Sequence, residues 1–575
     1  MKPLRFVLGY PREANPPDFP VKAPDPSKVC GSNPAFWHDS SEPFLTSSRQ
    51  CIVVGALFSQ DTWQRISGDD FPDCHETSIR FAKSFISRFW GGYVTLLSGS
   101  SRQDWVLLVD PSGYVPIYRI QTPTHVVFAS SPDLLSIAIG KPLCLSYPAI
   151  AAHLLRPELR QRSTCLHGVE ELPPGTIVRP SHGEAGTQTI WKAEDFTSPR
   201  AASSFEECAT SLRALSCSVM SCWSEAFGKV SVAASGGVDS SLICAALAAT
   251  QSPFDCITVT TLDSSGDERV YARDVATAFG VQCEEALYDP SRFDPFRSAS
   301  AALPRPARRS FLNVLDAGLT GAMQPLGSSV VCDGNAGDNL FCFLHSSAPV
   351  VDRLRAEGLG SAAIATLLDM CRITGCSTPT MLRATMRRMM RRGPRAYWPA
   401  DARFLVETSL SDEWQPLTSW LENGLPPNSG KRDHLALIMR AQNQIHGLTS
   451  GLLRFSPLAS QPLVEFCLSV PTWVWASGGQ NRALARAAFA CDLPASVLAR
   501  TSKAGPDSFI RNAFAKNRSR IAKRLIEGTL AANHVIDRAQ VEDAMAVDEI
   551  SDDTVIDRLL DLLEAENWAR SWLVR

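Results

Sequence analysis

The sequence lacks a long apolar run and carries almost no net charge. Its 575 residues include 56 basic and 59 acidic side chains, a formal net charge of −3, so no overall field draws it to nucleic acid. No stretch approaches the ~18 apolar residues of a membrane span. The first apolar run stops at Pro11, which is a poor pattern for a signal peptide. We expect a cytoplasmic protein without nucleic-acid or membrane partners.

The cysteines lack any spacing that indicates a metal or redox motif. There are 17 of them, an odd number, and none forms a CxxC pair or a His/Cys cluster with zinc spacing. Such residues are typical of reduced thiols that act as small core side chains. This pattern also favours the cytosol.

The first part of the chain is predicted to be rich in β-strands. A chain of this length is too long for one core and indicates two or more domains. Turn residues separate short β-branched and aromatic runs, followed by a turn and one more strand at 167–180, and a polar stretch then reaches about residue 200. We therefore predict an N-terminal domain over residues 1–195. The runs are 51–58, 91–98, 104–110, 115–120 and 125–130.

A different pattern begins after residue 205. Apolar strands at 230–234, 255–261 and 328–334 each lie beside a segment with helical spacing, which is typical of a parallel α/β sheet. From about residue 350 the pattern is mostly helical. We predict a second domain over residues 205–575, an α/β unit with a helical C-terminal part.

A glycine-rich turn, SGGVDS at 235–240, joins the first of these strands to a helical segment. Backbone N–H groups at such a turn make an anion site. The turn has neither the lysine of a Walker A loop nor GxGxxG spacing. Asp239 would repel a bound phosphate unless a cation lies between them, so it indicates Mg²⁺. An ordinary strand-to-helix turn is the alternative interpretation.

These six residues resemble the SGGxDS pyrophosphate loop of the N-type ATP pyrophosphatases. CDGNAGDNLF (332–341) is similar to the SGEGSDELF segment of asparagine synthetases, and further similar segments follow their order along nearly the whole chain. The resemblance implies an Ntn-hydrolase-like glutamine amidotransferase domain, then an ATP-pyrophosphatase domain that uses ATP and Mg²⁺. The further segments are DPSGYVPIY (110–118), FASSPDLLS (128–136), GVEELPPGT (168–176), residues 454–473 and residues 482–505.

The resemblance also implies roles for individual residues. Asp239 and Asp338 would bind Mg²⁺, and Lys503 would contact the phosphate and the developing oxyanion. Three residues of the implied site also have a structural interpretation: Asp333 would cap a turn, Thr260 would be an ordinary strand residue, and Lys503 would be a surface cation. The implied ATP and pyrophosphate site comprises Ser235, Gly236, Gly237, Asp239, Ser240, Ser241, Thr260, Asp333 and Gly334.

Three further charged features fall outside the implied ATP site. Arg454 and Arg500 flank the C-terminal motifs and would bind phosphate or a substrate carboxylate, or form ion pairs. Glu268, with Asp267, opens a helix and is favoured there by the helix dipole. The tract RATMRRMMRRGPR (383–395) has Arg and Met at helical spacing, which suits either an acidic or apolar peptide or a solvated helix face.

Departures from the asparagine synthetase pattern predict a different nucleophile. Lys2 stands where the glutaminases carry a nucleophilic Cys, and no NGEIYN-type glutamine-binding segment is present. We therefore expect an inactive glutaminase and an amine supplied by the substrate itself. Asn335 holds the catalytic position where asparagine synthetases carry Glu and β-lactam synthetases Tyr, and a neutral amide cannot be a general base.

The C-terminal segments SPLASQPLVEFCLSVPTW, GGQNRALARAAFACDLP and ARTSKAG look most like those of lasso peptide macrolactam synthetases. This implies ATP-dependent closure of a leader-cleaved core peptide, in which the N-terminal amine attacks an activated Asp or Glu side chain. A leader peptidase and a precursor-recognition protein are possible partners. The alternatives are an asparagine or β-lactam synthetase that acts on a small amino acid, and a nucleotide-binding scaffold without catalysis.

Overall fold

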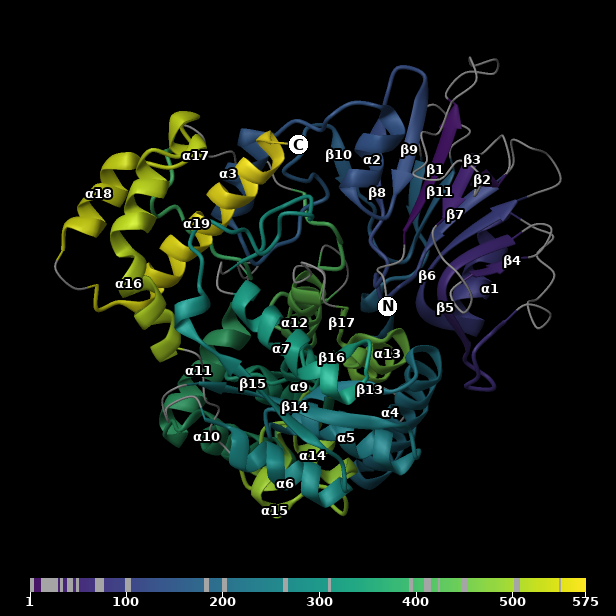
Figure 1. The fold of residues 1–575 in the computed structure, drawn as a ribbon. Helices are drawn as coiled ribbons and strands as arrows, with labels where there is room; N and C mark the ends of the chain where they lie inside the picture. Colours follow the sequence, from purple (N-terminus) through teal and green to yellow (C-terminus); the bar gives the residue numbers. More distant parts are fainter. Residues whose placement is uncertain are drawn as a thin grey trace.

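The computed structural model shows a β-rich region, a parallel sheet and many helices (Figure 1). The mixed α/β class predicted from the sequence is confirmed. The structure describes residues 5–11, 29–30, 35–38, 45–47, 51–67, 77–98, 105–179, 186–198, 204–261, 267–308, 312–391, 397–407, 415–421, 425–445, 453–500, 507–547 and 550–574.

The N-terminal region contains two antiparallel sheets with strand orders β10-β8-β9-β1-β3-β2 and β12-β11-β7-β6-β5-β4. Apolar side chains from both sheets, among them Leu8, Val54 and Phe128, form one buried cluster, so the sheets pack face to face. The strands are β1 (Phe6–Pro11), β2 (Val29–Cys30), β3 (Ala35–His38), β4 (Leu45–Ser47), β5 (Cys51–Ser59), β6 (Phe89–Ser98), β7 (Trp105–Val109), β8 (Tyr118–Gln121), β9 (His125–Ala129), β10 (Val169–Glu171), β11 (Thr176–Arg179) and β12 (Gly186–Thr189); the helices are α1 (Ile79–Arg88), α2 (Pro132–Ile139) and α3 (Tyr147–Leu155).

The second sheet system has five parallel strands in the order β15-β14-β13-β16-β17. Strands β14 and β15 follow β13 on one side of it, and strands β16 and β17 lie on its other side. The strand order therefore reverses between the neighbours β13 and β16. Ligands of such sheets bind beyond the carboxyl ends of the strands at this point. The elements are β13 (Val230–Ala233), β14 (Phe254–Thr261), β15 (Cys283–Tyr288), β16 (Val331–Asp333), β17 (Arg454–Phe455), α4 (Phe205–Phe227), α5 (Val238–Ala249), α6 (Arg269–Phe279) and α7 (Leu312–Leu326).

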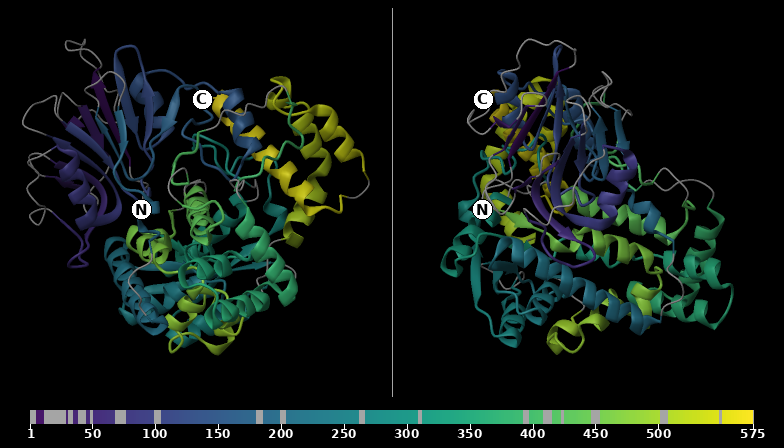
Figure 2. Two further views of the ribbon diagram at one scale, coloured as in Figure 1. Left: turned by 180° about the vertical axis from the view of Figure 1, so that it is seen from behind. Right: turned by 90° about the vertical axis from the view of Figure 1, so that its right-hand side faces the viewer.

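Helices dominate the chain after residue 336, somewhat earlier than the mostly helical pattern that the sequence predicts from about residue 350. Figures 1 and 2 show the last of them, α16 to α19, on the side of the molecule away from strands β1 to β7. The helices are α8 (Gly337–Leu340), α9 (Ala348–Glu357), α10 (Ser361–Thr374), α11 (Thr378–Met390), α12 (Gly430–Ile445), α13 (Gln461–Ser469), η9 (Val474–Gly479), α14 (Ala483–Ala488), α15 (Ala495–Leu498), α16 (Asp507–Ile526), α17 (Thr529–Ala532), α18 (Arg538–Ala546) and α19 (Asp553–Leu573).

The β-rich region and the parallel-sheet region share a buried interface. The Tyr114 hydroxyl donates a hydrogen bond to the Ser456 carbonyl at 2.6 Å, and the Gln461 backbone N–H donates to Ser112 Oγ at 3.0 Å. One apolar cluster also includes Phe58 of β5 and Trp223 of α4, whose rings lie 5.0 Å apart. Hydrogen bonds and apolar contacts therefore join the two regions. These contacts do not define a domain boundary, and the boundary expected near residue 200 stays a prediction.

Several cysteines that the structure describes, among them Cys165, Cys332 and Cys467, are buried free thiols. Cys244 and Cys256 face each other in the core with sulfurs 3.9 Å apart. In the described part of the chain, no helix combines the length and apolarity needed to span a bilayer.

Asp110, in the turn that leads to Tyr114, gives a pH-dependent prediction. Burial raises its pKa to about 7, although backbone N–H donors such as Gly113, at 2.7 Å, oppose the shift. Because this pKa lies above the usual 3.8, the folded state binds the proton more tightly than the unfolded state. The stabilisation is therefore present below about pH 4 and is lost as the pH rises through about 7.

We expect Asp110→Asn to remove this dependence, because the amide keeps the shape of the carboxyl without the charge. Relative to the variant, the parent chain should lose a few kcal/mol of unfolding free energy between about pH 4 and pH 8, since each pKa unit corresponds to about 1.4 kcal/mol. Denaturant unfolding of both chains across this range measures the difference. Parallel pH profiles would contradict the assignment.

Candidate functional site

Two loops meet at the carboxyl edge of the parallel sheet. The first runs from β13 through Ser235 to α5, and the second from β16 through Asn335 to α8. Strands β13 and β16 are hydrogen-bonded neighbours, with Ala233 opposite Asp333. The predicted pyrophosphate loop and the predicted CDGNAGDNLF segment therefore lie side by side, at the point of strand-order reversal.

The first loop has the backbone that an anion site requires. Gly236 has φ +64°, and a Cβ at this position would collide with Tyr271. Gly237 is the N-cap of α5 and makes no side-chain capping hydrogen bond to this helix, while its own N–H donates to Ser235 Oγ at 3.3 Å. The Ser235 and Ser240 hydroxyls lie 3.4 Å apart and brace the turn. Free N–H groups at the positive end of a helix suit a phosphate group.

Two glycines bring the second loop against α5. A Cβ on Gly334 would lie 2.7 Å from the Ser240 nitrogen, and one on Gly337 would lie 2.7 Å from Asp239 Oδ1. No real side chain fits at these distances. The close approach places Asp338, in the first turn of α8, beside Asp239, in the first turn of α5.

We expect Gly337→Ala to separate the two loops and to lower ATP-dependent AMP release by about tenfold or more, as displacing positioned groups does in other enzymes. Gly321→Ala in α7 is the matched control, because a Cβ there meets no atom within 4 Å. An AMP assay on both variants, with melting curves, makes the comparison. Equal activity of Gly337→Ala and the control would contradict this packing role.

Arg482 lies between the two carboxylates. Its Nε is 3.0 Å from Asp239 Oδ1, its Nη2 is 3.1 Å from Asp239 Oδ2, and it also forms an ion pair with Asp338. The guanidinium carbon is 5.0 Å from the centre of the Phe343 ring. The sequence alone does not indicate a role for Arg482, because nothing in QNRALAR shows which acids this cation meets.

The backbone before Arg482 is fixed by α10. The Gly478 N–H donates to Asp369 Oδ2 at 3.2 Å, and η9 is packed against α10. Arg482 itself has φ +54° at the start of α14, a left-handed conformation that is rare for a non-glycine residue. Such positions cluster at functional sites, and here the conformation aims a cation at the acidic pair.

The acidic pair fits a divalent cation only together with ligands from a substrate. Within the described residues, no group of three or more Asp, Glu, His or Cys side chains converges on one point. Two carboxylates plus phosphate oxygens and water are, however, the usual ligands of Mg²⁺ at nucleotide sites. Asp239 and Asp338 are therefore the residues that would hold Mg²⁺, with Arg482 displaced from its place between them.

The Asp333 carboxylate forms hydrogen bonds and an ion pair with nearby protein side chains. It accepts hydrogen bonds from Ser456 Oγ at 2.6 Å and from the Asn335 side-chain amide at 2.8 Å, and Arg454 Nε lies 3.3 Å away. Burial raises the pKa of this carboxyl, and the Arg454 charge opposes the rise. Asp333 therefore fixes the orientation of Asn335, and its carboxylate has little capacity left for a nucleotide.

Both predicted arginines form buried ion pairs. Arg454 joins Asp333 to Asp316, which lies 3.6 Å from its Nη1. Arg500 binds Glu268 at 2.5 Å and donates from Nη1 to the Ser235 carbonyl at 2.7 Å. The ion-pair interpretation is thus the one that the geometry favours, and Arg500 anchors the pyrophosphate loop.

The remaining predicted residues are placed as follows. Ser241 and Thr260 are both buried, Ser241 in α5 and Thr260 near the carboxyl end of β14, three residues beyond the partner of Ala233. The buried Ser241 hydroxyl meets no described donor or acceptor. Lys503, like Lys2, lies outside the residues that the structure describes.

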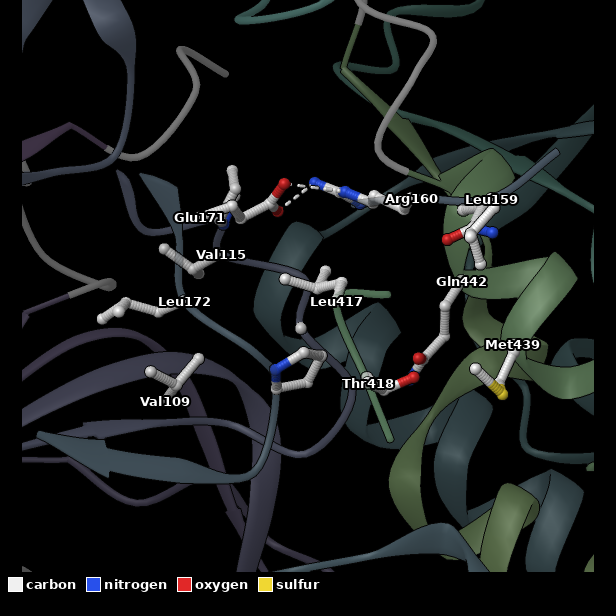
Figure 3. A pocket seen from close by; sticks show the side chains of 14 residues that line it. Val109, Val115, Leu159, Arg160, Glu171, Leu172, Leu417, Thr418, Met439 and Gln442 are labelled. Atoms are coloured by element: carbon white, nitrogen blue, oxygen red, sulfur yellow. Dashed lines mark hydrogen bonds and ion pairs between the residues drawn. The ribbon is translucent and has the colours of Figure 1, made fainter. Parts of the chain in front are cut away.

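A separate small cavity lies between the β-rich region and α12 (Figure 3). Val115, Leu172 and Leu417 line it, and Arg160 donates from Nε to Glu171 at 2.9 Å at its edge. None of its lining residues belongs to the two loops at the sheet edge. It is therefore distinct from the predicted nucleotide site.

The sequence model of the asparagine synthase family matches residues 212–570. This match includes both loops, the acidic pair and Arg482.

The chain belongs to the asparagine synthase family. Membership of this family indicates an ATP-dependent ligase that forms amide bonds, usually with Mg²⁺. No curated protein matches the chain.

Two solved structures show limited similarity to the chain. The glutamine phosphoribosylpyrophosphate amidotransferase from B. subtilis, complexed with ADP and GMP, is 11% identical over 50% of this chain and 60% of its own, with a TM-score of 0.19. The allosteric regulatory enzyme of purine biosynthesis is 11% identical over 50% of this chain and 74% of its own, with a TM-score of 0.20. The alignment thus spans less than two thirds of the first enzyme. Scores this low carry no argument about this chain.

Proposed function

We propose that this asparagine synthase family member closes a macrolactam ring in a lasso-type peptide. An Asp or Glu side chain of a leader-free core peptide attacks the α-phosphorus of ATP, which releases pyrophosphate. The N-terminal amine of the same peptide then attacks the acyl-adenylate carbonyl, loses a proton and releases AMP. One amide bond forms, and the peptide loses one water overall.

Asn335 is the observation that carries the proposal. Its side-chain amide donates to Asp333, so this position offers a fixed polar group and no side chain that can accept a proton. A site for free ammonia or a small amino acid would benefit from an ionisable group here. A peptide that brings its own amine to the acyl group needs only orientation at this position, because the attack is then intramolecular.

The chain's own residues supply the remaining functions. The loop from Ser235 to Ser240 would bind pyrophosphate through backbone N–H groups. Asp239 and Asp338 would hold Mg²⁺, which neutralises the charge of the departing pyrophosphate when bound. Arg482, which lies against both carboxylates, would supply a further positive charge to the same phosphates once Mg²⁺ displaces it. Lys503 would stabilise the oxyanion and the leaving phosphate, as the resemblance implies.

The proposal also includes partners and a location. A leader peptidase and a precursor-recognition protein would prepare the core peptide, and the reaction would take place in the cytoplasm, where ATP and reduced thiols are available. Three alternative activities remain: asparagine synthesis, β-lactam formation from a small amino acid, and nucleotide binding without catalysis.

AMP release with different substrates distinguishes these functions. We expect ATP to be converted to AMP and pyrophosphate with a leader-free lasso-type core peptide, and not with aspartate plus ammonia. Stimulation by aspartate, or by a small β-amino acid alone, would overturn the peptide proposal in favour of a small-molecule ligase. ATP binding without AMP release under every condition would favour the scaffold.

A further inference from the structure

Helices α10 and α11 expose an unusual apolar surface. Half of the large apolar side chains that are exposed in the described chain lie between residues 359 and 390, with Leu359 90% exposed and Met390 68% exposed. Figure 1 shows both helices at the periphery of the molecule, away from the β-rich region. We name this surface the Met/Arg face: Leu359, Ile364, Leu368, Leu382, Arg383, Met386, Arg387, Met389 and Met390.

Helical geometry sorts the α11 part of this face into two adjacent stripes. At about 100° per residue, Leu382, Met386 and Met389 fall within about 60° of one another, and Arg383 and Arg387 are about 40° apart on the neighbouring side. The buried residues Met381 and Thr385 lie opposite the basic stripe, and Thr385 is about 40° from Met389 at the near edge of the apolar stripe. The exposed half of α11 therefore presents an apolar stripe with a basic stripe beside it.

The opposite side of α11 is already used. Met381 packs with Val350 and Met370 in a small core that joins α11 to α9, α10 and η9, and Arg388 forms an ion pair with Asp433 at 2.7 Å. Arg383 and Arg387 form no ion pair with any described residue. Contacts of Met381 and Arg388 thus fix α11 against the rest of the protein, and the described chain leaves the Met/Arg face uncovered.

The chemistry of the face favours a protein over a lipid surface. Residues 359–391 contain no lysine and no aromatic residue. Membrane-binding helices use Trp and Phe with Lys or Arg, whereas Met and Arg are enriched and Lys is depleted at protein interfaces. The only acid in this segment is Asp369, which binds the Gly478 N–H, so the face has no internal counter-charge.

We propose that the Met/Arg face binds an acidic amphipathic helix of a partner protein. Apolar side chains at i, i+3, i+4 and i+7 of the partner would cover Leu382, Met386 and Met389, and flanking carboxylates would pair with Arg383 and Arg387. This inference does not depend on the proposed reaction, because no residue of the face belongs to the nucleotide site.

The probe is a labelled synthetic peptide about five helical turns long, with Leu at i, i+3, i+4 and i+7 and Glu on both flanks. Fluorescence anisotropy with the full chain should show saturable binding that weakens with added salt. Arg383→Glu/Arg387→Glu and Met386→Ala should each weaken it by about tenfold, or about 1.4 kcal/mol. A scrambled peptide should bind poorly, and Arg538→Glu, on exposed α18, should bind like the parent. Melting curves confirm that each variant folds.

Several results would overturn the proposal. Absent or non-saturable peptide binding, or equal binding by Arg383→Glu/Arg387→Glu, would show that the face does not recognise acidic helices. Co-sedimentation with phosphatidylglycerol vesicles that the same double variant abolishes would identify a membrane instead. A dimer in analytical ultracentrifugation that Met386→Ala dissociates would identify a second copy as the occupant.

Discussion

Asp239→Asn should abolish the conversion of ATP to AMP and pyrophosphate while the fold survives. The side chain lies beside the N-terminus of α5 and faces Arg482 and the second loop, so an amide of the same shape keeps the packing. It does not keep the negative charge that would hold Mg²⁺ on the phosphates. A metal ion supplies several kcal/mol of charge stabilisation in such reactions, and each 1.36 kcal/mol is a factor of ten in rate. We therefore expect a loss of about a thousandfold or more.

The matched control is Asp543→Asn on α18, an exposed acid outside the site, which should leave the rate unchanged. Asp338→Asn should resemble Asp239→Asn, because both carboxylates meet the same guanidinium. The assay is AMP formation with excess Mg²⁺, together with a melting curve for each variant. A near-normal rate for Asp239→Asn would remove the basis for the metal site.

Lys503→Ala should leave ATP binding intact and slow ring closure by on the order of 10² to 10³, the usual cost of one positioned group that stabilises a developing oxyanion. The amine attack builds charge on the carbonyl oxygen and on the departing phosphate, and an ammonium stabilises this charge mainly in the transition state. Lys503→Arg should rescue poorly, because a broad planar guanidinium does not replace a compact ammonium.

Single-turnover kinetics, with separate measurement of ATP binding and of cyclised peptide, test this role. Lys516→Ala is the control, because Lys516 is an exposed cation of α16. Ring closure by Lys503→Ala at the parent rate would make Lys503 a surface residue. Loss of ATP binding in Lys503→Ala would give it a binding role in place of the catalytic one.

Strands and loops were predictable from the sequence where the backbone preference of a few neighbouring residues determines the structure. The glycine turn at 235–240 lies where the sequence places it, because Gly236 requires φ +64° and the next residues open α5. The strand expected at 115–120 begins only at Tyr118, since Pro116 has no N–H for a ladder. β15 was missed because its sequence CEEALY carries two consecutive acids, which are depleted in strands.

The contacts of the site were not predictable, because they join residues far apart in the chain. Arg482 meets Asp239 across 243 positions, and Ser456 meets Asp333 across 123. The sequence leaves Arg454 as either a phosphate ligand or an ion-pair partner, and only the fold shows that it is buried against Asp333 and Asp316. A motif indicates which residues belong to a site, and tertiary packing decides which of them remain free to bind a ligand.

Mass spectrometry of a linear core peptide incubated with the purified chain, ATP and Mg²⁺ shows whether this chain closes a macrolactam ring. We expect a product that has lost one water, with AMP and pyrophosphate formed in equal amounts, and fragmentation that places the new amide between the N-terminal amine and an Asp or Glu side chain. The parent chain should form it and Asp239→Asn should not. An unchanged peptide, with asparagine or a β-lactam made instead from a small amino acid, would show that this chain is not a macrolactam synthetase.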